Sequence, residues 1–192
     1  MEKGFDSYIS DSQTVFRKVL DAMANPGMAM ELGVGIFPPE CLCPAAGAIL
    51  MTLLDFETPL WSNLHHDSKE LQWLKFHTGA PFTHLRQNAS FALCTDCEDI
   101  GDLDLFNRGT IESPQLSTTL IVQVKGIDGG ESLRLTGPGI QTQTFLKLTG
   151  LKDQFFEKRA RIYKAYPLGV DMIFVWGTIL VAIPRTTRVE IL

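Results

Sequence analysis

The segment Met172-Ile-Phe-Val-Trp-Gly-Thr-Ile-Leu-Val-Ala-Ile183 is the clearest indication of the fold. Residues 172–176 and 179–183 are rich in β-branched and aromatic side chains and flank Gly177, a pattern that predicts a β-hairpin. Residues 188–191 are expected to add a last strand. The end of the chain is therefore expected to be rich in strands.

Upstream of this hairpin, segments typical of helices alternate with segments typical of strands. Apolar residues at helical spacing, bounded by capping and breaking residues, predict helices at 12–24, 44–54, 67–76 and 151–164, and a weaker one at 99–106. Runs of β-forming residues predict strands at 28–32, 58–61, 91–95, 119–124 and 133–136. This order predicts an α/β fold, with a mixed sheet flanked by helices on both faces.

The helical patterns also predict caps and buried faces. Ser12 is expected to cap the first helix, whose buried face is expected to comprise Phe16, Val19, Leu20 and Met23. Asp67 and Glu70 have the spacing of a capping box for the third helix. The last helix is expected to expose a basic run, formed by Lys158, Arg159, Arg161 and Lys164.

Length and composition predict one globular domain covering residues 1–192. Of the 192 residues, 45% are hydrophobic and 20% are charged, which excludes a disordered, collagen-like or coiled-coil chain. A chain of this length buries enough surface to form a core without disulfides or metal. We find no linker, internal repeat or low-complexity tract that would divide it.

The charge and the apolar segments argue against nucleic acid and membranes as partners. The formal net charge is −5, so the chain lacks the basic surface of a duplex-DNA binder. The most apolar stretches, residues 45–54 and 172–183, are shorter than the ~20 residues that cross a bilayer. Residues 1–10 include Glu2 and Asp6 and lack the pattern of a secretory signal, so we expect a cytoplasmic protein.

The cysteines and histidines are candidate metal ligands. The pairs Cys41-x-Cys43 and Cys94-x-x-Cys97 allow a zinc site, but we expect reduced, structural thiols. We expect each histidine to be a surface or hydrogen-bonded residue, because none has an orienting partner nearby in the sequence. The four histidines are His65, His66, His77 and His84. We therefore expect no metal and identify no nucleophile.

A glycine turn and three arginines are candidate phosphate ligands. Gly137 and Gly139 follow a predicted strand, but Pro138 between them has no backbone donor, so a tight turn is the stronger interpretation. Arg185 and Arg188, with Arg134 as a further candidate, are suited to binding phosphate through two parallel hydrogen bonds. Alternatively, these arginines pair with Glu190 or other carboxylates, or contact a partner subunit.

Six segments in order resemble a known family. They are Phe16-Arg-Lys-Val-Leu-Asp-Ala-Met-Ala-Asn-Pro-Gly27, Thr58-Pro-Leu-Trp61, Phe76-His-Thr-Gly-Ala-Pro81, Leu133-Arg-Leu-Thr-Gly-Pro-Gly-Ile140, Tyr166-Pro-Leu-Gly-Val-Asp171 and Ile183-Pro-Arg-Thr-Thr-Arg-Val-Glu190. Together they resemble the PhnH subunits of bacterial carbon-phosphorus lyase, across nearly the whole chain. The cysteine pairs and the basic run lie outside this pattern.

The resemblance implies a fold similar to the large domain of pyridoxal-phosphate (PLP)-dependent transferases, without the cofactor. It also implies a subunit, forming a homodimer when isolated, of an assembly that makes ribose 1-alkylphosphonate 5-triphosphate from ATP and an alkylphosphonate. We expect a structural or non-catalytic role, because no catalytic set is readable. The alternative is a free-standing enzyme or binder that holds phosphate with Arg134, Gly137, Gly139, Arg185 and Arg188.

Overall fold

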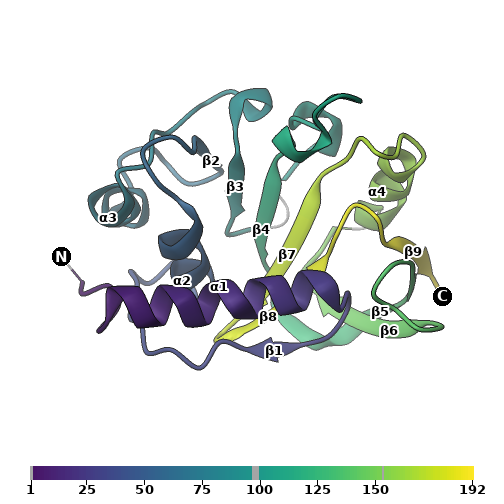
Figure 1. Cartoon of the computed structure of the whole chain (residues 1–192), viewed down its shortest axis with the longest axis horizontal. Helices are drawn as coiled ribbons and strands as arrows, with labels where there is room; N and C mark the ends of the chain where they lie inside the picture. Colours follow the sequence, from purple (N-terminus) through teal and green to yellow (C-terminus); the bar gives the residue numbers. More distant parts are fainter. Residues whose placement is uncertain (1, 97–99, 153) are drawn as a thin grey trace.

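The structure is a computed structural model that describes residues 2–96, 100–152 and 154–192 (Figure 1). Within these ranges the chain forms four α-helices and two β-sheets. The larger sheet has six strands in the order β1-β8-β7-β4-β3-β2. These strands are β1 (Met30–Glu31), β2 (Leu60–Ser62), β3 (Phe91–Cys94), β4 (Thr119–Gln123), β7 (Asp171–Trp176) and β8 (Ile179–Ile183).

The larger sheet is mixed, as the sequence predicts. β2, β3, β4 and β7 are parallel, β8 pairs antiparallel with β7, and β1 pairs antiparallel with β8. Trp176 lies opposite Ile179 across the turn at Gly177, which confirms the predicted hairpin. Gly177 has a φ of 57°, a conformation that glycine adopts without steric cost.

Alternating side chains of the larger sheet enter two separate cores. In β4, Leu120 and Val122 enter one core and Ile121 enters the other, since successive residues of a strand point to opposite faces. β7 repeats this alternation with Phe174 and Ile173. The central strands are buried on both sides, which explains their nearly continuous apolar sequences.

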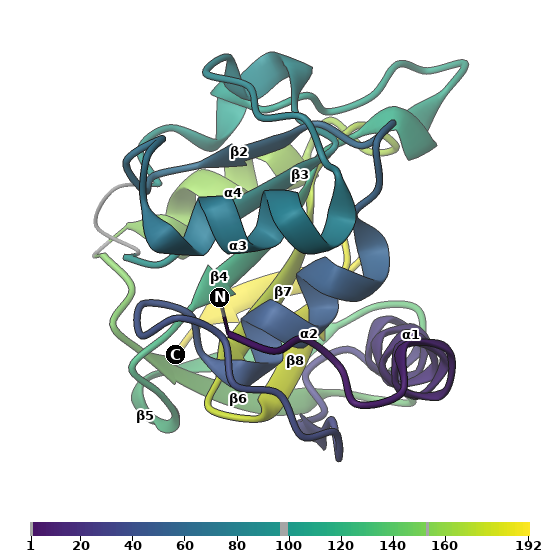
Figure 2. The same cartoon turned by 90° about the vertical axis from the view of Figure 1, so that its left-hand side faces the viewer.

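Helices α1 (Tyr8–Ala24), α2 (Pro44–Leu53) and α3 (Lys69–Thr78) cover one face of this sheet, as Figure 2 shows. α2 is the most buried of them: all residues from Ala45 to Met51 are buried, and Pro44 occupies the first turn, where no backbone donor is needed. The predicted second helix is thus confirmed.

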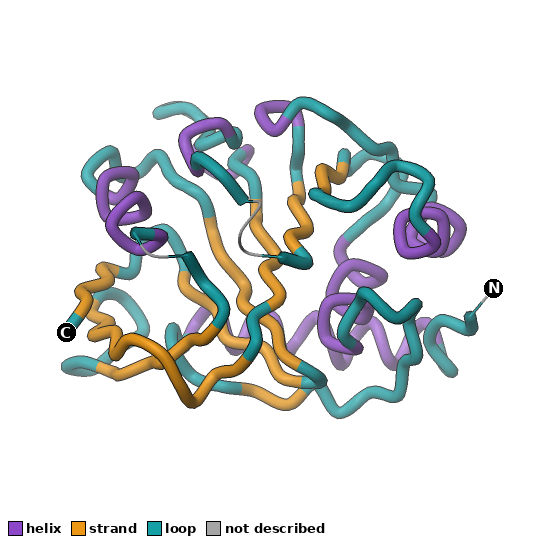
Figure 3. Tube along the Cα trace, turned by 180° about the vertical axis from the view of Figure 1, so that it is seen from behind, coloured by secondary structure: helices purple, strands orange, loops and turns teal. Residues whose placement is uncertain are grey.

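The opposite face is covered by α4 (Phe155–Tyr163) and by a three-stranded antiparallel sheet. That sheet has the order β6-β5-β9, with β5 (Gly126–Thr136), β6 (Thr144–Thr149) and β9 (Arg188–Ile191). In Figure 3 these strands lie on the side of the molecule that carries the C-terminus, opposite the N-terminus. Helices flank the larger sheet on both faces, as expected, whereas the separate second sheet was not predicted.

Two helix starts differ from the prediction. α1 begins at Tyr8 after the cap Ser7, whose backbone N–H donates to Asp11 Oδ2 at 2.9 Å, so Ser12 is not the cap. α3 is capped by Ser68, whose Oγ accepts from the N–H of Leu71 at 3.3 Å. The Asp67 capping box was wrong by one residue, because either residue has a side chain able to cap.

The buried face of α1 also differs. Val15, Val19 and Ala22 are buried, whereas Phe16 and Leu20 are 46% and 51% exposed. The burial predicted for Phe16 and Leu20 was therefore wrong.

Three short 3₁₀ helices complete the described elements, at Arg86–Asn88, Leu103–Leu105 and Pro114–Leu116. The helix predicted at 99–106 is reduced to the single turn Leu103–Leu105, and Asp99 lies outside the described residues. The strand predicted at 28–32 is limited to β1, which pairs with the first two residues of β8.

Candidate site at the C-terminal arginines

A surface cavity of about 470 Å³ lies between α4 and β9. Its lining combines apolar and charged side chains, namely Ala160, Tyr163, Lys164, Arg188, Val189 and Glu190. α4 contributes Ala160 and Tyr163, one turn apart and so on one helix face, and Lys164 follows directly. The cavity brings Lys164 of the predicted basic run together with Arg188 of the predicted arginine set.

Glu190 joins Arg134 to Arg188. Pairing of β5 with β9 places Arg134 opposite Glu190, and Arg134 Nε donates to Glu190 Oε2 at 2.9 Å, with a second contact from Nη2 to the same oxygen. Arg188 Nη2 lies 3.0 Å from Glu190 Oε1. The hydrogen bond from Arg134 lowers the pKa of Glu190. The carboxylate thus neutralises part of the positive charge at the cavity.

Arg185 is held by Asp171 at the start of β7. Its backbone N–H donates to Asp171 Oδ1 at 2.8 Å, and its guanidinium contacts both carboxylate oxygens and the carbonyl oxygen of Pro114. The two charged side chains are only 15% and 13% exposed. Arg185 therefore cross-links β7 to the turn after β8 and does not line the cavity of Arg188.

Arg159 lies inside the protein, which corrects the prediction that it faces solvent. It is 4% exposed, and its guanidinium donates to the carbonyl oxygens of Thr187 at 2.9 Å and Pro184 at 2.7 Å. Burial lowers its pKa to about 10. The sequence does not distinguish Arg159 from the other residues of the basic run, of which Arg161 and Lys164 are exposed. The sequence pattern of the run is therefore typical of a solvated helix face.

Gly137 and Gly139 form a turn that packs against other backbone segments. The N–H of Ile140 donates to the carbonyl of Gly137 at 3.1 Å, in agreement with the predicted turn. A Cβ on Gly137 would lie 2.9 Å from the carbonyl oxygen of Thr186, and one on Gly139 would clash with the carbonyl of Ala24 at the end of α1. Gly139 lines a different cavity from Arg188, so the structure does not bring all five candidate residues together.

Cys41 and Cys43 are free thiols, and the three described cysteines differ in exposure. Cys41 is exposed, Cys43 is half-buried and Cys94 is buried in the sheet core, while Cys97 lies outside the described residues. Desolvation raises the pKa of Cys41, with a further contribution from Glu70, and desolvation also raises the pKa of Cys43. Raised pKa values favour the protonated thiols, which are poor nucleophiles.

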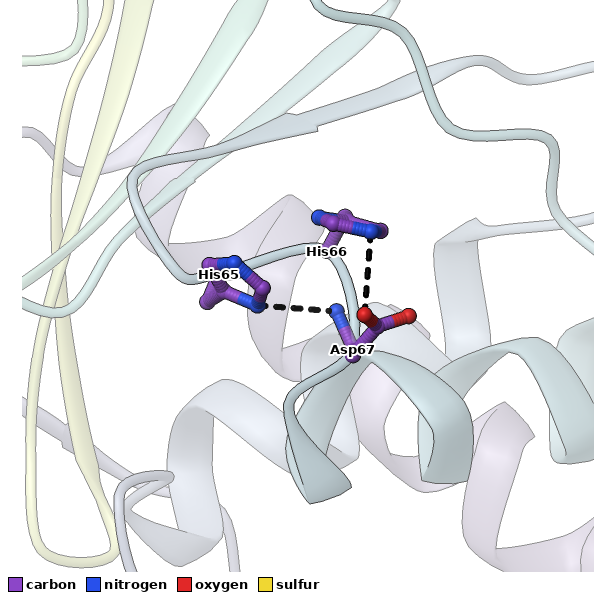
Figure 4. Close-up of side chains that lie close together, drawn as sticks. All are labelled: His65, His66 and Asp67. Carbon is purple, nitrogen blue, oxygen red and sulfur yellow. Dashed lines mark hydrogen bonds and ion pairs between the residues drawn. The ribbon is translucent and has the colours of Figure 1, made fainter.

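His65 and His66 lie with Asp67 in the loop between β2 and α3 (Figure 4). His66 Nε2 is 3.0 Å from Asp67 Oδ2, so the prediction that no histidine has a partner nearby in the sequence was wrong. The rings of His65 and His66 are 4.4 Å apart between centroids and tilted by 39°. His77, in contrast, packs edge-on against Trp73.

Among the described residues, every helix is too short or too polar to span a membrane.

Comparison with known proteins shows the family. A family model described as bacterial phosphonate metabolism protein (PhnH) matches residues 3–190. The "Alpha-D-ribose 1-methylphosphonate 5-triphosphate synthase subunit PhnH" of Rhizobium meliloti (strain 1021) is 35% identical over 187 residues, 97% of this chain and 94% of that protein. The "Putative C-P lyase subunit protein HtxG" of Stutzerimonas stutzeri is 31% identical over 93% of this chain and 86% of that protein. The chain therefore belongs to the bacterial phosphonate metabolism protein (PhnH) family.

Proposed function

We propose that this chain is a subunit of a phosphonate-degrading assembly, supporting formation of ribose 1-alkylphosphonate 5-triphosphate from ATP and an alkylphosphonate. Its family and the names of the two relatives reported above support this proposal. Its own role in that assembly is structural and not catalytic.

Three of the arginines are bound to acceptors within the protein, and this observation supports the structural role best. Arg185 is paired with Asp171, Arg159 with two backbone carbonyls, and Arg134 with Glu190. A guanidinium already bound to protein acceptors has fewer donors for a phosphate, and breaking such pairs costs free energy. In the part of the chain that the structure describes, these side chains fasten β5 to β9, and α4 and β7 to the turn that precedes β9.

An exposed apolar row on α1 supports contacts with other subunits. Ile9, Phe16 and Leu20 are 84%, 46% and 51% exposed and recur at spacings of seven and four residues, so they share one face of the helix. We call these three residues the α1 stripe. Apolar side chains gathered on a surface are typical of protein interfaces. The same stripe is the proposed contact of a homodimer when the chain is isolated.

We also propose that the fold is related to the large domain of PLP-dependent transferases, without PLP. A parallel sheet core with an antiparallel neighbour and helices on both faces is compatible with it. The described lysines are exposed or half-buried, whereas a Schiff-base lysine would be held in a protected site.

Affinity purification tests the subunit role. The tagged chain, isolated from its own host during phosphate starvation, should carry other subunits of the assembly. A chain with Phe16→Glu and Leu20→Glu should recover fewer of them, and Phe76→Glu on α3, also an exposed aromatic, is the matched control. Recovery of the wild-type chain without any partner subunit would contradict the proposal.

A second candidate function, a free-standing phosphate-binding enzyme or binder, is favoured by one observation. Arg188 and Lys164 line the same 470 Å³ cavity, and the side chain of Arg188 is 62% exposed. Of the other candidates, Arg134 contacts this site through Glu190, whereas Gly137, Gly139 and Arg185 do not line the cavity. Calorimetry of the purified chain with ATP, methylphosphonate and PLP separates the two candidates, because the structural role predicts little or no heat from each ligand. Binding that is lost in Arg188→Ala would favour the second.

A further inference from the structure

Three neighbouring side chains in the loop after β2 have the composition of a metal site. The potential ligand atoms of His65, His66 and Asp67 all lie within 4.8 Å of one another, and all three residues are exposed (Figure 4). The two imidazole rings are 4.4 Å apart between centroids, and His66 Nε2 is 3.0 Å from Asp67 Oδ2. Imidazole nitrogens with a carboxylate oxygen are ligands typical of Zn²⁺ and related transition metals.

A second segment brings another imidazole to this loop. His84 lines, with His65 and His66, a cavity of about 210 Å³ beside β2. Backbone hydrogen bonds fix the segment of His84 against β2: Leu60 donates to the carbonyl of Pro81 at 2.9 Å, and Thr83 donates to that of Leu60 at 3.0 Å. Residues far apart in sequence therefore converge on one cavity, and three of the four histidines of the chain lie there.

The potential ligand atoms of His65, His66 and Asp67 are spaced almost as in a coordinated metal, and His84 lines the same cavity as the two histidines. With Zn–N and Zn–O bonds of about 2.0–2.1 Å, two ligands of a tetrahedral site lie ~3.4 Å apart, so separations of 3.0 to 4.8 Å require only small side-chain rotations. Exposed side chains make such rotations at low cost. The carboxylate of Asp67 also supplies negative charge beside the N-terminus of α3, whose dipole would otherwise disfavour a cation.

We propose that His65, His66, Asp67 and His84 form a binding site for a divalent transition metal of the Zn²⁺ class. The site goes beyond the proposed subunit function and shares no residue with the arginines or the α1 stripe.

Cobalt binding tests the proposal, because Co²⁺ substitutes for Zn²⁺ and reports its ligands by visible absorption. The tag-free full chain carries Cys41→Ser and Cys43→Ser as background, which removes one exposed and one half-buried thiol that would compete for metal. We expect one Co²⁺ per chain, an absorption spectrum of nitrogen and oxygen ligation, and displacement by Zn²⁺. The affinity should fall about tenfold or more in each of His66→Ala, Asp67→Asn and His84→Ala.

His77→Ala is the matched control, since His77 belongs to α3 but packs against Trp73, away from the loop. Circular dichroism of each variant verifies the fold, which exposed substitutions should preserve. A background protein that binds no Co²⁺ would overturn the proposal, as would unchanged affinity in His66→Ala, Asp67→Asn or His84→Ala.

Discussion

Arg159 and Arg185 fix the turn that connects β8 to β9. Arg159 reaches from α4 to the carbonyls of Pro184 and Thr187, and Arg185 within the turn binds Asp171 of β7. Buried carbonyl groups need hydrogen-bond donors, and a guanidinium offers five in fixed geometry. The two arginines therefore hold the start of β9, which builds one wall of the 470 Å³ cavity.

Replacing Arg159 by Met should destabilise the protein by about 2–4 kcal/mol, because two buried carbonyls lose charged donors while the packing of the stem is largely kept. Urea denaturation measures the change in the free energy of unfolding. Arg161→Met, an exposed neighbour on the same helix, should change it by less than ~0.5 kcal/mol. Equal effects of the two substitutions would contradict the role of Arg159.

The ion pair between Glu190 and Arg134 should make the stability of the protein depend on pH. Its pKa is lower in the folded chain than the usual 4.5, mainly because Arg134 donates to the carboxylate. Its stabilising contribution is therefore present above pH 4.5 and is lost as the pH falls through the lower folded pKa. The stability difference between wild type and Glu190→Gln should shrink between pH 7 and about pH 3 in urea denaturation. A difference that stays constant over this range would contradict the ion pair.

At the scale of elements, local sequence patterns predicted well which segments form helices and strands. They predicted less well which face of an element is buried. The hairpin of β7 and β8 was predicted from the turn residue Gly177 between two apolar runs. The buried helix α2 was predicted from Pro44 in its first turn and the apolar run that follows. α1 carries apolar residues on two faces, and only packing against α2 and β8 selects Val15 and Val19 over Phe16 and Leu20. The pattern alone does not distinguish the two faces.

The second sheet was missed for a related reason. β5 begins with a glycine-rich part, residues 126–130, and its pairing with β6 shifts register between Gly126 and Glu131. A bulged, glycine-containing strand lacks the strict alternation that marks a half-buried strand. Within β5, only residues 133–136 were recognisable as a strand, and of these 133–135 pair regularly with both β6 and β9.

The α1 stripe predicts how the isolated chain associates. Wild-type protein at micromolar concentration should sediment as a dimer, and Phe16→Glu with Leu20→Glu should sediment as a monomer of about 21.4 kDa, since charges on the stripe oppose its burial. Both positions are partly exposed, so thermal stability should change little. Phe76→Glu should remain dimeric. A monomeric wild type would exclude the homodimer.

At the scale of the whole molecule, sequence order predicted the family and the α/β architecture, while the site was predicted only in part. Arg134 and Arg188 do meet, through Glu190, but Tyr163 and Lys164 of the same cavity were not selected as candidates. Helical spacing placed these two residues in the helix predicted at 151–164, yet nothing local shows that this helix packs beside β9. The histidine loop was undervalued because its partner His84 arrives from another segment.

Adenine release tests most directly whether this chain acts as a structural subunit. The purified chain is incubated alone with ATP and methylphosphonate, and then together with the other subunits of its assembly, while free adenine is measured. We predict no release above the protein-free rate by the chain alone, and release by the complete assembly that falls when this chain is omitted. Adenine release by the isolated chain that disappears in Arg188→Ala would contradict the account.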